Sequence, residues 1–155
     1  MSNLDILLKE AMNSELEAKK FYKEASIKAQ SKAGKKLFHE LAEFERNHYE
    51  RLKKMIETRT NIENIKIQET QKDLTIKPEI KGEFEPNKDE IVDIINLAIE
   101  AEKKAQDRYH KIAEMSNDED GKKIFNRLAL EERNHQRILE DEFYQLSNKG
   151  IILWD

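Results

Sequence analysis

Apolar residues recur in alternating steps of three and four along four long stretches of the chain. This spacing places them on one face of an α-helix and therefore predicts amphipathic helices. The expected helices cover residues 3–31, 35–57, 89–116 and 119–147, and Gly34 is predicted to separate the first two. The stretch 86–89, Pro-Asn-Lys-Asp, indicates a stop followed by an N-cap for the third. Because each apolar face is too narrow to stabilise a helix alone, we expect one all-α four-helix bundle.

The segment between the second and third helices has a different composition. Residues 58–88 contain Pro78, Gly82 and Pro86, and their apolar residues form short alternating runs. We interpret this segment as a long crossover that makes the second and third helices parallel. The chain is expected to be a single domain over residues 1–155, with helical hairpins at 3–57 and 89–147 and a tail at 148–155. The apolar residues 151–154 of the tail are expected to dock on the bundle or on another subunit.

The two predicted hairpins have related sequences. When the chain is shifted by 87 positions, residues 4–57 align with residues 91–144 without a gap and share 15 identities in 54 pairs. A Gly-Lys-Lys run and a Glu-Arg-Asn-His run recur at matching places in both halves. The repeat indicates two helical hairpins related by an approximate twofold axis.

Composition narrows the classes of function. The formal net charge of −4 argues against a general nucleic-acid-binding surface, which needs a basic face. The absence of cysteine excludes disulfides, thiolate-ligated zinc, iron–sulfur clusters and thiol catalysis. We expect no signal peptide at the start, and no apolar run approaches the roughly 20 residues that span a bilayer. These observations favour a cytoplasmic protein that binds neither membranes nor nucleic acid.

Each predicted apolar face carries a glutamate where an apolar residue would continue the pattern. The second and fourth helices also carry a histidine three residues after that glutamate, on the same face of the helix. The six residues are Glu15, Glu45, His48, Glu102, Glu132 and His135. One Glu-x-x-His is weak evidence, but two copies at the same place in a repeat, each opposite another buried glutamate, form a strong signal.

Four buried carboxylates must be paired, protonated or bound to a cation. Without metal they are expected to crowd one space of low dielectric constant and to have raised pKa values. The apolar faces contain no lysine or arginine to neutralise them. Two divalent ions would balance four carboxylates, and oxygen ligands with one imidazole per ion suit iron or manganese.

The pattern Glu15…Tyr22, Glu45-x-x-His48, Glu102…Tyr109, Glu132-x-x-His135 resembles the ferritin-like di-iron proteins. Among these it is most similar to the rubrerythrin type, called erythrin where the bundle stands alone, and the resemblance covers all four helices. It implies that Glu45 and Glu132 bridge two iron ions. It also implies that Glu15 and His48 complete one iron site, and that Glu102 and His135 complete the other.

The resemblance further implies that Tyr22 and Tyr109 hydrogen-bond to ligand carboxylates across the bundle. Plain core packing is the alternative for these two tyrosines. The sequence departs from the family pattern in two ways. Rubrerythrins proper carry a cysteine-ligated rubredoxin module, which this chain lacks. They also have an additional ligand glutamate where this chain has Ala105. The expected site is therefore a symmetric six-ligand one, as in bacterioferritins.

The implied function is that of a non-haem di-iron oxidoreductase that reduces peroxide, or dioxygen, in defence against oxidative stress. Its cofactor would be two iron ions per chain, bridged by oxide or hydroxide when oxidised, with manganese or zinc as alternatives in isolated protein. Ferroxidase or iron-handling activity is one alternative function, and a non-enzymatic metal-binding bundle is another. The implied partners are a separate electron donor, such as a rubredoxin or a reductase, and a second copy of the chain. We expect a homodimer, either with or without an exchange of hairpins between the two subunits.

Overall fold

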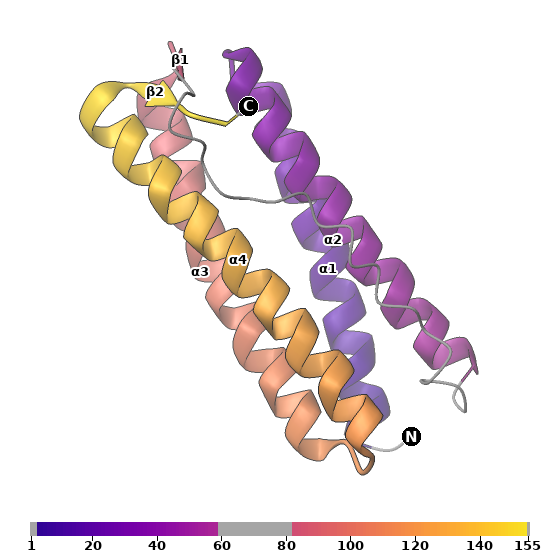
Figure 1. Ribbon diagram of the computed structural model, residues 1–155. Coiled ribbons are helices and arrows are strands. Elements are labelled where there is room, and N and C mark those ends of the chain that lie inside the picture. The colour runs from indigo at the N-terminus through magenta and orange to yellow at the C-terminus, as the bar shows by residue number, and fades with distance from the viewer. Residues whose placement is uncertain (1–2, 59–81, 155) are drawn as a thin grey trace.

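Four long helices form a bundle in the computed structural model, which describes residues 3–58 and 82–154 (Figure 1). Helices α1 (Asn3–Lys28) and α2 (Lys32–Thr58) make one hairpin, and α3 (Lys88–Met115) and α4 (Glu119–Lys149) make the other. Helices α2 and α3 run in the same direction, so the end of α2 and the start of α3 lie at opposite ends of the bundle (Figure 1). The chain therefore crosses over between the hairpins, as expected, although most of the predicted crossover 58–88 lies outside the described residues.

The boundary between the first two helices differs from the prediction. Helix α1 ends at Lys28 and α2 already begins at Lys32, so the break lies at residues 29–31. Gly34, which was expected to separate the two helices, lies inside the first turn of α2. The prediction was wrong because Glu85, from a distant part of the chain, contacts residues 30 and 31 at this boundary.

A buried carboxylate, Glu85, caps the start of α2 from outside the hairpin. Its oxygens accept hydrogen bonds from the backbone amides of Gln30 and Ser31 at 3.0–3.3 Å and from the Ser31 hydroxyl at 3.0 Å. An anion at this position satisfies amides that have no partner within the helix and interacts favourably with the helix dipole. A Cβ atom at Gly34 would lie 2.7 Å from Glu85 Oε1. Gly34 therefore permits close approach of this carboxylate and does not end α1.

Replacing Glu85 with alanine is expected to lower the free energy of unfolding by about 1–3 kcal/mol, because the amides of Gln30 and Ser31 would lose their acceptor in a buried place. Urea unfolding of the metal-free protein measures this loss. Glu100→Ala is the matched control, because Glu100 is an exposed carboxylate whose ion pair with Lys103, at 3.4 Å, contributes little. Equal losses in the two variants would show that Glu85 does not have this capping role.

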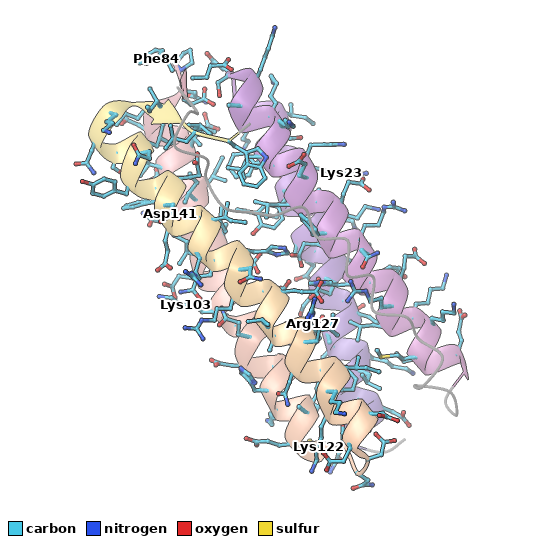
Figure 2. All side chains as sticks on the ribbon, viewed as in Figure 1. Lys23, Phe84, Lys103, Lys122, Arg127 and Asp141 are labelled. Atoms are coloured by element: carbon cyan, nitrogen blue, oxygen red, sulfur yellow. The ribbon has the colours of Figure 1, made fainter. Side chains whose placement is uncertain are left out.

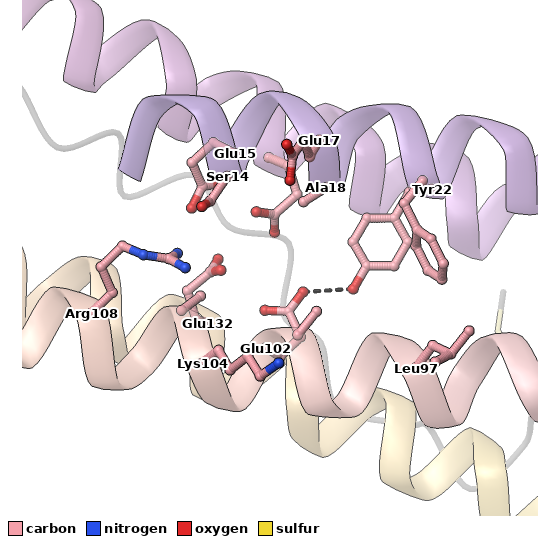
Figure 3. Close-up of a pocket in the computed structure, with 14 residues that line it drawn as sticks. Ser14, Glu15, Glu17, Ala18, Tyr22, Leu97, Glu102, Lys104, Arg108 and Glu132 are labelled. Atoms are coloured by element: carbon pink, nitrogen blue, oxygen red, sulfur yellow. Dashed lines mark hydrogen bonds between the residues drawn. The ribbon is translucent and has the colours of Figure 1, made fainter. Parts of the chain in front are cut away.

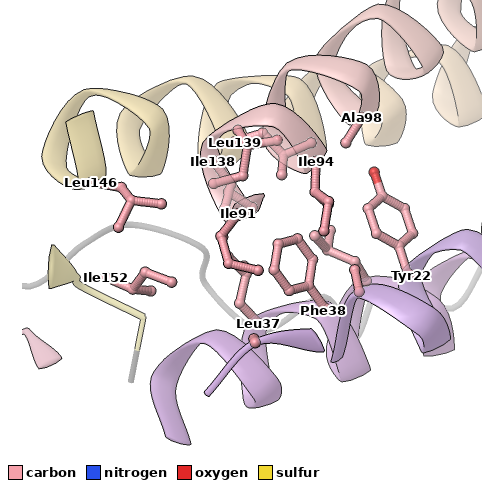
Figure 4. Close-up of a cluster of buried hydrophobic side chains, with 14 of the residues drawn as sticks. Tyr22, Leu37, Phe38, Ile91, Ile94, Ala98, Ile138, Leu139, Leu146 and Ile152 are labelled. Atoms are coloured by element: carbon pink, nitrogen blue, oxygen red, sulfur yellow. The ribbon is translucent and has the colours of Figure 1, made fainter. Parts of the chain in front are cut away.

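Two hydrophobic clusters fill the bundle on either side of one polar layer. The cluster near the strands, drawn in Figure 4, includes Leu37, Phe38, Ile91, Leu139 and Leu146. The cluster toward the opposite end includes Leu8, Leu52, Ile112, Phe125 and Leu128. In every helix the predicted metal-ligand positions fall between the residues of these two clusters. The apolar clusters thus hold the four helices in register around the polar layer.

The C-terminal tail docks on the bundle of its own chain. Strand β2 (Ile151–Ile152) pairs antiparallel with β1 (Glu83–Phe84), and Ile152 is fully buried in the cluster near the strands. The Trp154 indole Nε1–H donates a hydrogen bond of 2.7 Å to Glu40. Of the two expected docking places, the tail therefore uses the bundle of its own chain, and the homodimer stays a prediction of the sequence.

Charged side chains cover the outer faces of the helices. Lys23, Lys103 and Asp141 point away from the bundle (Figure 2). Arg46, which stands between Glu45 and His48 in the sequence, is exposed and forms an ion pair of 2.9 Å with Glu43. Within the described part of the chain, no helix has the length and apolarity needed to cross a membrane.

Candidate metal centre

The structure brings together all six residues that the sequence singled out. Each is at most 3% exposed, and they come from all four helices. Their ligand atoms form two groups in which the atoms lie within 4.8 Å of one another. One group consists of Glu15, Glu45, His48 and Glu132, and the other of Glu45, Glu102, Glu132 and His135. Glu45 and Glu132 belong to both groups, as residues that bridge two ions would.

In the first group, the Nδ1 atom of His48 faces the carboxylates. It lies 2.9 Å from Glu132 Oε1, 3.5 Å from Glu15 Oε2 and 3.9 Å from Glu45 Oε2. These acids come from α4, α1 and α2, so the group requires three helices to meet at one level. The contacts to α4 also show that neither hairpin builds its half of the centre alone.

The second group repeats this geometry around His135. Its Nδ1 atom lies 3.0 Å from Glu45 Oε1, 3.4 Å from Glu132 Oε1 and 3.7 Å from Glu102 Oε2. The two imidazole rings are stacked, with centroids 6.0 Å apart and planes inclined by 17°. The approximate twofold relation in the sequence is thus present in the inward-facing atoms of the centre.

Both tyrosines hydrogen-bond across the bundle to carboxylates on the opposite hairpin, as the resemblance implied. The Tyr22 hydroxyl donates to Glu102 Oε1 at 2.6 Å, and the Tyr109 hydroxyl donates to Glu15 Oε1 at 2.7 Å. Burial raises the pKa of both tyrosines well above the ordinary value, and the charges of nearby glutamates add to this effect. The hydroxyls therefore stay protonated and act as donors that hold these carboxylates in place.

Sequence reasoning missed two buried residues on the outer side of the centre. Glu131 is 2% exposed, and its Oε1 lies 3.2 Å from Nε2 of His48. Arg51 donates two hydrogen bonds to the same carboxylate, at 3.1 and 3.2 Å. The repeat gave no signal for either residue, because neither is matched by an identical residue in the other half. One local indication in the sequence that Arg51 lies near the centre is its position one helical turn after His48.

The buried carboxylates do not all titrate alike. Burial raises the pKa of Glu45 well above its ordinary value, and the charges of neighbouring glutamates, Glu132 foremost, add to this. Burial likewise raises the pKa of Glu102 to about 8. The pKa of Glu132 is lowered: burial would raise it, but the two histidines, with His48 foremost, outweigh burial. The expectation of raised pKa values is therefore confirmed for Glu45 and Glu102 and wrong for Glu132.

The pKa values of the two histidines are raised, so both are expected to be protonated at neutral pH in the metal-free protein. Burial alone would lower the pKa of an imidazole, but the surrounding carboxylates favour its charged form. The charges of Glu132 and Glu15 raise the pKa of His48 well above its ordinary value. The carboxylates of Glu102 and Glu132, which face the ring, raise the pKa of His135 to about 10. Protons therefore provide the positive charge that a metal would otherwise supply.

The donor set fits a pair of divalent ions. Buried atoms that face the cluster have no hydrogen-bond partner among the described residues, and these are Glu15 Oε2, Glu102 Oε2, Glu132 Oε1 and His48 Nδ1. Within the same residues, the ion pairs formed by the four glutamates are with histidines, and none is with lysine or arginine. Four carboxylates and two imidazoles are a ligand set suited to iron or manganese.

A pocket of about 410 Å³ between α1 and α3 leads to this cluster, and the four glutamates are among the residues that line it (Figure 3). Ala105, which stands where rubrerythrins have another ligand glutamate, also lines the pocket. The exposed residues Leu97 and Lys104 belong to its lining and lie on its solvent side. A water molecule occupies roughly 30 Å³ of liquid. The pocket is therefore large enough for a small oxidant to reach the carboxylates from solvent.

Comparisons with known proteins give a family match and a fold match. The sequence model of the rubrerythrin family matches residues 7–143, a range that includes all six candidate ligands and both tyrosines. The fold is similar to that of a hypothetical protein from Pyrococcus furiosus, with a TM-score of 0.74 and 27% sequence identity. That match covers 94% of this chain and 91% of the other. No curated protein matches the sequence significantly.

Proposed function

The chain belongs to the rubrerythrin family, and we propose that it is a di-iron oxidoreductase that reduces hydrogen peroxide. The observation that carries the proposal is the pair of buried four-residue groups that share Glu45 and Glu132. Burial of so many ionisable groups in one place is costly for a purely structural bundle. A pair of metal ions in contact with both Glu45 and Glu132 would offset this cost.

The six residues have distinct roles in this proposal. Glu45 and Glu132 would contact both ions, Glu15 and His48 would hold one of them, and Glu102 and His135 would hold the other. Each histidine would bind through Nδ1, because that atom faces the carboxylates in both groups. Tyr22 and Tyr109 orient the carboxylates of Glu102 and Glu15 through the hydrogen bonds of their hydroxyls.

A pair of ferrous ions would supply the two electrons that reduce hydrogen peroxide, with two protons, to two molecules of water. The pocket between α1 and α3 gives the oxidant a route to the glutamates. The chain contains no cysteine for a rubredoxin-type iron site. We therefore propose that a separate protein, such as a rubredoxin or a reductase, returns the two electrons.

Anaerobic loading with iron, followed by peroxide or dioxygen in the presence of a reduced rubredoxin, tests this function. We expect peroxide to be consumed and one peroxide to oxidise two one-electron donors. Tyr22→Phe is expected to slow the reaction about tenfold while the chain still binds iron, because a carboxylate loses its orienting donor. Phe21→Leu is the matched control, since Phe21 also lines the pocket but has no polar atom.

The same experiment separates the other functions. Iron oxidation by dioxygen, with little peroxide turnover and release of the ferric product, would indicate a ferroxidase. Iron binding without consumption of either oxidant would indicate a non-enzymatic metal-binding bundle. Either result would contradict the proposed peroxide reduction.

A further inference from the structure

The internal repeat breaks at two positions that lie against the metal centre. Glu131 corresponds to Phe44 in the other half of the chain, and Arg51 corresponds to Ile138. All six candidate ligands, in contrast, match residues of the same type. The inward faces of the two histidines are therefore alike, whereas their outward faces are not.

The outward nitrogen of His48 has a charged partner. Its Nε2 lies 3.2 Å from Glu131 Oε1, and Arg51 holds the same carboxylate through two hydrogen bonds. Glu131 is 2% exposed and Arg51 is 9% exposed, so the arrangement is screened from water. The guanidinium balances the charge of the carboxylate and orients it toward the ring.

The outward nitrogen of His135 has no such partner. Its Nε2 is buried and makes no hydrogen bond within the described residues. The ring packs against Phe44, with centroids 5.0 Å apart and planes inclined by 45°. Phe44 thus occupies, on this side, the place that Glu131 has on the other. If Nδ1 bound an ion, the Nε2–H of His135 would be a buried donor with no acceptor among the described residues.

A carboxylate that accepts the outer N–H of a ligand histidine fixes the tautomer and the ring, and it increases the basicity of the nitrogen that binds the metal. Loss of such a partner typically lowers metal affinity 10- to 100-fold. We propose that the two metal positions are inequivalent, and that the position held by His48 binds the first ion because Glu131 and Arg51 position this histidine. The inference rests on the proposed di-metal site.

Stepwise addition of zinc to the metal-free full chain tests this order, with imidazole nitrogens observed by NMR. Zinc is diamagnetic and accepts imidazole and carboxylate ligands. The chain has only four histidines, and two of them, His39 and His110, are exposed and belong to neither ligand group. We expect the His48 signals to change mainly with the first equivalent and the His135 signals mainly with the second. Simultaneous changes, or the reverse order, would overturn the inference.

Glu131→Gln supplies an independent readout of the positioning role. It is expected to weaken zinc binding at His48 by about tenfold or more and to leave binding at His135 within about twofold. Glu43→Gln is the matched control, because Glu43 also forms an ion pair with an arginine, Arg46, but its side chain is partly exposed and belongs to neither ligand group. Equal weakening at both histidines, or no weakening at either, would contradict a role specific to His48.

Failure of this inference is distinguishable from failure of the proposed function. If zinc binds two per chain but without order, only the inequivalence is wrong. If neither His48 nor His135 responds to zinc, the di-metal site itself is wrong. The wild-type experiment gives this answer without any variant, so it does not depend on how well Glu131→Gln folds.

Discussion

Glu45→Ala and Glu132→Ala are each expected to abolish binding of both metal ions, whereas Glu15→Ala is expected to impair only one. The reason is geometric, because Glu45 and Glu132 belong to both ligand groups and Glu15 belongs to the first alone. Metal analysis of the reconstituted protein should give two ions per chain for the wild type and at least one for Glu15→Ala. Glu43→Ala, which removes a partly exposed carboxylate two residues before Glu45, should retain both ions.

Two results would contradict this arrangement. One is a single ion in the reconstituted wild-type chain. The other is full retention of two ions after removal of Glu45 or Glu132. Zinc can replace iron during purification, because the affinity order of divalent ions favours zinc over ferrous iron. The count of ions is therefore a sharper test than the identity of the metal in freshly isolated protein.

The metal-free protein is expected to lose stability as the pH rises from about 6 to 9. Folding raises the pKa of Glu102 to about 8 and that of His135 to about 10. In this pH range the folded chain therefore binds more protons than the unfolded chain, and the free energy of unfolding falls with increasing pH. We expect the melting temperature in chelator to be lower at pH 9 than at pH 6 by on the order of 5 °C.

The lowered pKa of Glu132 acts in the opposite direction and at lower pH. Its contribution is present above the unfolded pKa of about 4.3 and is lost on further acidification. The metal-free chain should therefore be most stable at mildly acidic pH. Bound metal displaces the protons, so metal affinity should rise with pH and the loaded protein should not share the alkaline loss.

Glu102→Gln tests the assignment of this pH dependence. It removes the carboxyl group whose pKa is raised to about 8, so the decline between pH 6 and 9 should become shallower. Glu100→Gln, which changes an exposed glutamate paired with Lys103 on the same helix, should leave the wild-type profile unchanged. If the metal-free wild type melts at the same temperature from pH 6 to 9, the proposal that the metal-free centre holds extra protons is wrong.

The sequence by itself determined the helices and the inward-facing residues of the centre. Helical periodicity is a local property, and a glutamate such as Glu15 that occupies a place in an apolar series must be buried once the helix packs. The repeat then related Glu45 and His48 to their counterparts in the second half without any knowledge of contacts. For the same reason the family resemblance was accessible, since its motifs consist of spacings along single helices.

Only the tertiary structure decided the features that depend on contacts between distant segments. Glu131 contacts His48 from another helix, and Glu85 caps a helix that begins 53 residues earlier, at Lys32. The lowered pKa of Glu132 likewise depends on His48, which lies on another helix and is the foremost of the causes that outweigh burial. None of these partners is related by helical spacing or by the repeat. Periodicity reports which side of a helix faces the core, but it does not report which side chain lies opposite, because that depends on how four helices pack.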